Sequence, residues 1–204
     1  VNEITFIPMT ADQRKSGSDW VNVDCIFVDT DLQVVTVDNA SLVNKPVRLE
    51  AENAVIGRYT NTTGAGKSGT AVGGINRDPS FMQTFADLQE NGLTDKSGIA
   101  YVSYMVDVPE AGSYTLRSVY RVAMNSGYEL ASYYMTASVN DKAFYQMAYA
   151  PYGTETNGWA ESETVVQLEK GYNVIRMISV NADNNASVSW LDQDYIEIEG
   201  DQKV

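Results

Sequence analysis

The sequence predicts an all-β protein, an antiparallel β-sandwich, and three observations lead to that fold class. Short segments in which Val, Ile, Tyr and Thr alternate with polar residues recur along the chain, such as YVSYMVDV at 101–108 and YNVIRMISV at 172–180. Turn-forming Gly, Pro, Asn and Asp residues separate these segments, as in PEAG at 109–112. Helical periodicity is scarce, and its best example, at 81–89, fits either one short helix or a long loop.

The individual strands are predicted in chain order from runs rich in β-branched and aromatic side chains. Turn signals follow such runs, for example VND at 139–141 and EKG at 169–171. The predicted strands are 4–9, 25–30, 32–37, 48–54, 101–108, 114–122, 133–139, 172–180 and 189–200.

A change of pattern near residues 44–46 divides the chain into an N-terminal extension, residues 1–44, and a sandwich module, residues 45–204. Forty-odd residues rarely fold alone without a disulfide or a metal. The extension is therefore expected to pack on the sandwich, as β-strands at its edge, or else to be the tail of a preceding domain.

Composition excludes several classes of function. The formal charge is −13, with no cluster of basic residues, which argues against nucleic acid and against an anionic membrane surface as partners. The chain has no histidine and a single cysteine, Cys25, so it cannot form a Ser-His-Asp triad, a His-based zinc site or an intramolecular disulfide. An enzyme of this composition would have to use carboxylates, Lys or Tyr.

Two acidic residues of the predicted strand at 48–54 form a candidate metal site. Glu50 and Glu52 are two positions apart, so a strand would place both carboxylates on one face. Like charges that close repel each other unless a cation lies between them, and Ca²⁺ prefers hard oxygen ligands of this kind. Taken alone, the pair is better explained by two solvated glutamates on an exposed face.

A set of motifs spread over residues 48–200 gives that pair a context. In order, they are LEAENA (49–54), GAGKSGTAVGGI (64–75), VDVPEAGSYTLRSVYRV (106–122), a lone Trp159 before TVVQLEKGYNVIRM (164–177), and DYIEIEG (194–200). Together these motifs resemble the carbohydrate-binding modules of family 35 and of the related family 6. The resemblance covers about three quarters of the chain, and the ordered set is more specific than any single motif.

The resemblance implies a β-jelly roll with a structural calcium ion. Its ligands would be Glu50, Glu52, Asp194 and a backbone carbonyl near Lys67. The strand pattern agrees, because the first and last strands of such a roll pair and bring distant carboxylates to one edge.

The resemblance also implies a sugar site in the loops at one end of the sandwich. Trp159 would stack on a sugar ring and Asp192 would bind its hydroxyl groups. Trp159 lies in the polar segment TETNGWAES (154–162), where we expect an exposed indole; the alternative is that it folds back onto the core. Further candidates in the same predicted loops are Tyr152, Asn157, Asn184 and Asn185. The long connection at 75–98 departs from the family pattern, and either adds ligand contacts or blocks the usual cleft.

The expected function is a non-catalytic module that keeps an attached enzyme on plant cell-wall polysaccharide. We expect an extracellular bacterial protein, a segment of a larger secreted enzyme, that binds mannan, xylan, galactose or uronic acid units. A uronic acid would require a second, bridging calcium ion held by Asp183 or Asp192.

Two other classes of function remain open from the sequence. One is a carboxylate-based glycosidase or lyase that uses Asp192 with Asp194 or Glu161. The other is an adhesion or scaffold sandwich that binds a protein or glycan partner, which predicts a contiguous apolar patch on the surface.

Overall fold

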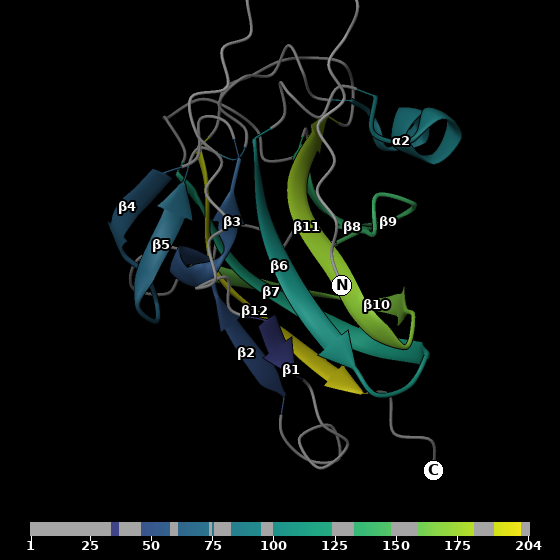
Figure 1. Cartoon of the computed structure of the whole chain (residues 1–204). Helices are drawn as coiled ribbons and strands as arrows, with labels where there is room; N and C mark the ends of the chain where they lie inside the picture. Colours follow the sequence, from purple (N-terminus) through teal and green to yellow (C-terminus); the bar gives the residue numbers. More distant parts are fainter. Residues whose placement is uncertain are drawn as a thin grey trace, which may run out of the picture. The chain divides into compact units, whose positions relative to one another are not determined.

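The computed structural model describes residues 34–36, 46–57, 61–73, 75, 83–94, 100–123, 133–147, 159–181 and 190–200, all within one compact unit at 32–204. These residues form two six-stranded sheets packed face to face, which confirms the predicted all-β sandwich (Figure 1). Apart from one parallel edge pair, the strand pairs are antiparallel.

Sheet A has the strand order β1-β6-β11-β8-β9, and β3 also pairs with β6. Its strands are β1 (Val34–Thr36), β3 (Val55–Ile56), β6 (Tyr101–Val108), β8 (Tyr133–Val139), β9 (Ala143–Gln146) and β11 (Gly171–Asn181). Sheet B has the order β10-β7-β12-β5-β4, and β2 also pairs with β12. Its strands are β2 (Val47–Glu50), β4 (Asn61–Ala65), β5 (Thr70–Gly73), β7 (Gly112–Ala123), β10 (Trp159–Leu168) and β12 (Trp190–Gly200).

The core lies between the two sheets and follows the period-two alternation of the sequence. Every second residue of a long strand points into it, so that polar residues alternate onto the outer faces. Buried examples from four strands are Val102, Val106, Leu116, Tyr120, Ile175, Met177, Ile196 and Ile198.

Part of the N-terminal extension joins sheet A. Strand β1 pairs in parallel with β6, with Val34 opposite Met105 and Thr36 opposite Asp107. The predicted strands at 4–9 and 25–30 lie outside the described residues. Within the described part of the chain, no helix has the length and apolar character needed to cross a membrane.

A short helix, α2 (Phe85–Asn91), forms within the predicted 75–98 connection and settles the choice that the pattern at 81–89 left open. Its N-cap residue Thr84 accepts a hydrogen bond from the Asp87 N–H at 3.1 Å, and Asp87 accepts one in return from the Thr84 N–H at 3.2 Å. Leu88 of this helix is buried with Phe144 and Ile178 of sheet A. The helix therefore adds an apolar cluster outside the main core.

We expect Thr84→Ala to lower the free energy of unfolding by about 1 kcal/mol, because it removes the hydroxyl oxygen that accepts the hydrogen bond of the Asp87 N–H. Urea denaturation followed by circular dichroism measures the difference. A loss near zero would show that α2 is held by its apolar contacts alone.

Candidate functional site

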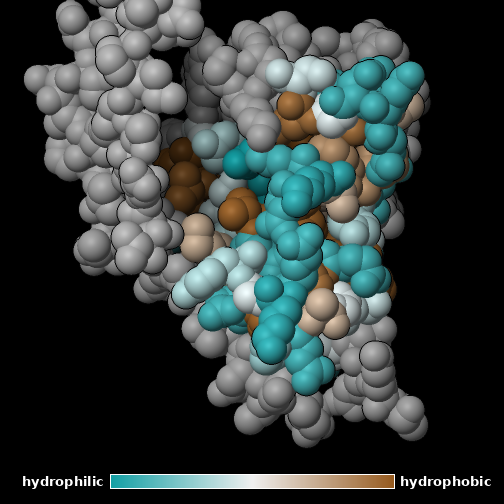
Figure 2. Space-filling model, turned by 45° about the vertical axis from the view of Figure 1, so that its right-hand side comes forward, coloured by the Kyte–Doolittle hydropathy of each residue, from teal (hydrophilic) through white to brown (hydrophobic). Residues whose placement is uncertain are grey.

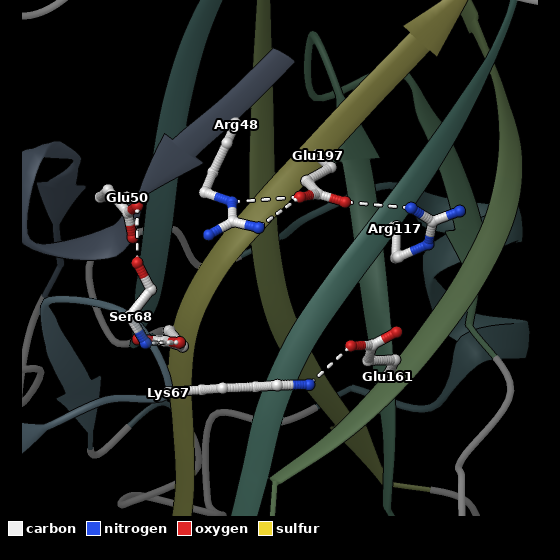
Figure 3. Close-up of polar contacts among 8 residues, drawn as sticks. Arg48, Glu50, Lys67, Ser68, Arg117, Glu161 and Glu197 are labelled. Atoms are coloured by element: carbon white, nitrogen blue, oxygen red, sulfur yellow. Dashed lines mark hydrogen bonds and ion pairs between the residues drawn. The ribbon is translucent and has the colours of Figure 1, made fainter. Parts of the chain in front are cut away.

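Three acidic side chains, Glu50, Glu52 and Asp194, meet beside the loop at 66–69; we call them the carboxylate cluster. Asp194 Oδ2 accepts a hydrogen bond from the Ser68 N–H at 2.8 Å, and Glu50 Oε1 accepts one from the Ser68 hydroxyl at 3.1 Å. Glu52 Oε1 accepts one from the Thr70 N–H at 3.0 Å. Ser68 of this loop and Thr70, the first residue of β5, thus together contact all three carboxylates, and Figure 3 shows Ser68 below Glu50.

The pairing of the first and last strands of the module brings these residues together. In the β2–β12 ladder Glu50 lies opposite Tyr195, the residue after Asp194, as the sequence predicts for such a roll. The predicted strand over 48–54, which would place Glu50 and Glu52 on one face, is wrong, however. The strand ends at Glu50, and Glu52 belongs to the 3-10 turn η2 (Ala51–Asn53).

The second oxygen of each carboxylate is buried and has no hydrogen-bond partner: Glu50 Oε2, Glu52 Oε2 and Asp194 Oδ1. Asp194 is fully buried, at 0% exposure. Burial without a partner is costly for a carboxylate oxygen, so these three atoms lack the hydrogen-bond partner that buried polar atoms normally have.

The pKa shifts around the cluster are those expected for buried carboxylates that lie close together. Burial raises the pKa of Asp194, and the charges of Glu50 and Glu52 add to the rise although the Ser68 N–H lowers it. Tyr104 of β6 has a buried hydroxyl with no partner, and its pKa is raised well above the usual value by burial and by the same three carboxylates. Negative charge is therefore concentrated where water is excluded.

Two glycines explain why the loop can wrap so closely around the carboxylates. A Cβ on Gly66 would lie 1.8 Å from Asp194 Oδ1 and 2.6 Å from the Ser68 carbonyl oxygen. Gly69 has a φ of +59°, and a Cβ there would lie 2.2 Å from Glu52 Oε1. Glycine is thus required at positions 66 and 69 by the carboxylates that the loop encloses.

The residues around the carboxylate cluster are of the types that bind calcium, but their present arrangement is not that of a formed calcium site. Carboxylate oxygens and the nearby Ser68 carbonyl are the hard ligands that Ca²⁺ takes. No three His, Cys, Asp or Glu side chains of the described residues are arranged closely enough to hold an ion as they stand, so binding requires the carboxylates to draw in. The predicted Lys67 carbonyl ligand stays a prediction: the loop contributes Lys67 and Ser68 backbone N–H groups to Asp194.

A β-bulge orients Asp194. The register of β12 against β7 shifts between Gln193 and Tyr195, so the side chains of Gln193 and Asp194 both point inward. Gln193 fixes the bulge with hydrogen bonds from its amide nitrogen to the carbonyl oxygens of Val119 at 2.9 Å and Tyr195 at 2.7 Å. Its amide oxygen accepts a third bond from the Ser118 hydroxyl at 3.1 Å.

The bulge also separates Asp192 from Asp194. A regular strand would place these two residues, two positions apart, on one face. Instead Asp192 lies on the outer face of sheet B beside Arg121, whereas Asp194 lies in the carboxylate cluster. The two carboxylates considered together for a glycosidase or lyase are therefore not neighbours on one face.

The predicted sugar residues Trp159 and Asp192 do lie in one row across sheet B, which we call the terminal row. Trp159 is opposite Arg121 in the β10–β7 ladder, and Arg121 is opposite Asp192 in the β7–β12 ladder. Arg121 was not among the residues predicted from sequence, although the alternation of YTLRSVYRV already places it on the face opposite Leu116 and Tyr120.

The prediction that the Trp159 indole is exposed is wrong. Trp159 begins strand β10, is only 6% exposed, and packs with Ala71, Val119 and Tyr195. The Arg121 guanidinium carbon lies 4.9 Å from the centroid of its ring. The face of the indole that was expected to stack on sugar is therefore shared with a cation.

Asp192 is also buried, and it forms an ion pair with Arg121. Its Oδ2 atom accepts hydrogen bonds from Arg121 Nη2 at 2.5 Å and from Arg121 Nε at 3.2 Å. The other predicted ligand residues, Tyr152, Asn157, Asn184 and Asn185, lie outside the described residues, as does Asp183. The chain continues from the terminal row into the same predicted loops, since β10 and β12 begin at Trp159 and Trp190.

The rest of the outer face of sheet B carries a network of ion pairs (Figure 3). Glu197 accepts hydrogen bonds from Arg48 at 2.8 Å and from Arg117 at 3.0 Å. Lys67 reaches across β12 and β7 to Glu161 at 2.9 Å. Such exposed pairs contribute little to stability, but they occupy Glu161, the other carboxylate considered for catalysis.

The surface in Figure 2 is mostly hydrophilic, with hydrophobic residues in separate small areas among the described residues. The large hydrophobic side chains that are exposed in the described part of the chain come from three strands: Val55, Ile56, Val165 and Tyr172. Among the described residues on this face, Figure 2 shows no contiguous apolar patch of the kind that a scaffold role predicts.

Comparison with known proteins supports the fold. No family model and no curated protein matches the sequence. Among solved structures, a family 35 carbohydrate-binding module from Clostridium thermocellum is 19% identical with a TM-score of 0.54, over 76% of this chain and 98% of that module. The C-terminal family 6 module of the laminarinase LamC from Zobellia galactanivorans is 15% identical with a TM-score of 0.51, over 76% of this chain and 100% of that module.

The same fold occurs within a longer enzyme. The isomalto-dextranase of Arthrobacter globiformis T6, complexed with panose, is 20% identical with a TM-score of 0.50, over 75% of this chain and 23% of that enzyme. The chain therefore has the fold of family 35 and family 6 carbohydrate-binding modules, as the motifs at 48–200 predict.

Proposed function

We propose that this chain is a non-catalytic carbohydrate-binding module of a larger secreted bacterial enzyme that acts on hemicellulose or pectin. The observation that carries the proposal is the terminal row. It brings a ring, a guanidinium and a carboxylate together at the end of sheet B where the resemblance places the sugar site. Fold alone does not determine function, so the proposal depends on these side chains.

The chemistry of the row suits a sugar. Arginine and aspartate provide charge-assisted hydrogen bonds, and sugar hydroxyl groups both donate and accept. Asp192 and Glu161, two of the carboxylates considered for glycoside hydrolysis, are each ion-paired among the described residues, which favours binding over catalysis.

We further propose that the carboxylate cluster binds calcium. Glu50, Glu52, Asp194 and the Ser68 carbonyl would hold the ion, which would neutralise the buried charge and link β2 to β12. What the chain itself contributes is the positioning: the loop at 66–69, here called the glycine loop, and the adjacent Thr70 orient one oxygen of each carboxylate and leave the other oxygen free of hydrogen bonds.

Affinity gel electrophoresis tests the sugar-binding role. We expect at least one neutral polymer among mannan, xylan and galactan to retard the protein relative to a gel without polymer, while bovine serum albumin migrates equally in both. Equal mobility of the folded protein in every gel would contradict the proposal. Trp159→Ala is a poor probe here, because emptying this buried site is expected to cost about 3–5 kcal/mol of stability.

A further inference from the structure

Tyr104 of β6 carries a hydroxyl group that is buried in the core and has no hydrogen-bond partner. The residue is 3% exposed and lies opposite Ile175 in the ladder between β6 and β11. It belongs to the same core cluster as Leu49 and Ala51, the two residues that flank Glu50 in the chain. A buried tyrosine hydroxyl normally finds a partner, so this one requires an explanation.

The Tyr104 hydroxyl lies within reach of the charges of the carboxylate cluster. After burial, the causes of its raised pKa are the charges of Asp194, Glu50 and Glu52, and Asp194 acts most strongly of the three. Tyr104 points inward from sheet A and Asp194 points inward from sheet B, where its Oδ1 atom is also buried without a partner. The raised pKa keeps the phenol protonated at neutral pH, so the site combines unpartnered acceptors with an unpartnered donor.

The present arrangement leaves that donor and those acceptors unbonded, and the charges of the carboxylates give a reason. Three carboxylates enclosed together repel one another, which opposes their closer approach. A calcium ion among them would offset this repulsion and allow the carboxylates to draw in. An outer hydrogen bond to a ligating carboxylate then fixes the orientation of that ligand.

We propose that Tyr104 is a positioning residue of the calcium site, whose hydroxyl donates a hydrogen bond to Asp194 Oδ1 when the carboxylates draw in around the ion. This inference rests on the proposed calcium binding and extends that site from sheet B to sheet A. Calcium bound in this way would join the two sheets through the core, in addition to linking β2 to β12.

Tyr104→Phe tests the role of the hydroxyl, because it removes that group and keeps the ring in the core. In chelator we expect a melting temperature equal to that of wild type or higher, since the hydroxyl has no bond to lose there. The Kd for calcium, measured by isothermal titration calorimetry, should rise about 10- to 100-fold, as for other sites that lose an outer-shell partner.

Tyr114→Phe is the matched control. It makes the same chemical change in the same core cluster, but the Tyr114 hydroxyl already donates a hydrogen bond to the Glu110 carbonyl oxygen at 2.7 Å. We expect this variant to lose stability equally in chelator and in calcium, and to bind calcium with the Kd of wild type.

Ultraviolet difference spectra detect the new hydrogen bond itself, because a phenol absorbs at longer wavelength when it donates one. Calcium should shift tyrosine absorption of the wild type and of Tyr114→Phe to longer wavelength. The same addition should produce a smaller shift, or none, in Tyr104→Phe.

The results separate the role of Tyr104 from the calcium binding on which it rests. A Tyr104→Phe variant with the wild-type Kd for calcium, or with the same calcium-induced difference spectrum as wild type, would overturn that role and leave the calcium site intact. A folded wild type that takes up no calcium in equilibrium dialysis would overturn both.

Discussion

In chelator, Asp194→Asn should unfold at a higher temperature than wild type, and in millimolar calcium the order should reverse. Without a cation, the variant removes one of three buried negative charges but can still accept the Ser68 N–H bond through its amide oxygen. We expect the free energy of unfolding of the variant to be about 2 kcal/mol higher than that of wild type, which raises the melting temperature by roughly 4–8 °C in a domain of this size. With calcium at a hundred times its Kd, ion binding raises the free energy of unfolding of the wild type alone by about 2.7 kcal/mol.

Differential scanning calorimetry of both proteins, in EGTA and in calcium, measures the reversal. Glu163→Gln is the control, because it neutralises an exposed carboxylate that is distant in sequence from the cluster and belongs to a surface ion pair. Its melting temperature should follow that of wild type in both buffers. If calcium left the wild-type melting temperature unchanged, or if Asp194→Asn were the less stable protein in EGTA, the carboxylate cluster would not be a calcium site.

Gly66→Ala should abolish the stabilisation by calcium. Its Cβ would stand 1.8 Å from Asp194 Oδ1, a distance that no relaxed structure allows, so the loop or the carboxylate must move. We expect a loss of about 1–3 kcal/mol in chelator, as for other overpacked sites, and little or no further increase in melting temperature when calcium is added.

Gly112→Ala provides the comparison, since nothing lies within 4 Å of the position of its Cβ. It should leave both the stability and the calcium response close to those of wild type. A Gly66→Ala variant that is stabilised by calcium as strongly as wild type would show that the glycine loop does not form part of the ion site.

The sandwich could be predicted from sequence because its long strands, such as β6 and β11, alternate apolar and polar residues over their full length. The convergence of Glu50, Glu52 and Asp194 could also be predicted, although from the resemblance and not from the strand geometry first suggested. Glu52 lies in a 3-10 turn that the sequence AEN does not predict.

The details of the sugar site could not be predicted. A β-bulge depends on the hydrogen bonds of Gln193 across the sheet, and nothing local in the sequence marks it. Trp159 follows a polar segment and was expected in a loop, but its burial comes from residues distant in sequence, Ala71, Val119 and Tyr195. The partner of Asp192 is 71 positions away on another strand and is known only once the register is known.

The most direct test of sugar binding at the terminal row is a ¹H–¹⁵N spectrum of the protein during titration with an oligosaccharide of the polymer that binds. We predict that the Arg121 Nε–H and the Trp159 indole N–H signals move in proportion to saturation, while the amide signals of helix α2 stay in place. Stationary Arg121 and Trp159 signals, with shifts gathered on α2 or on sheet A, would contradict the account.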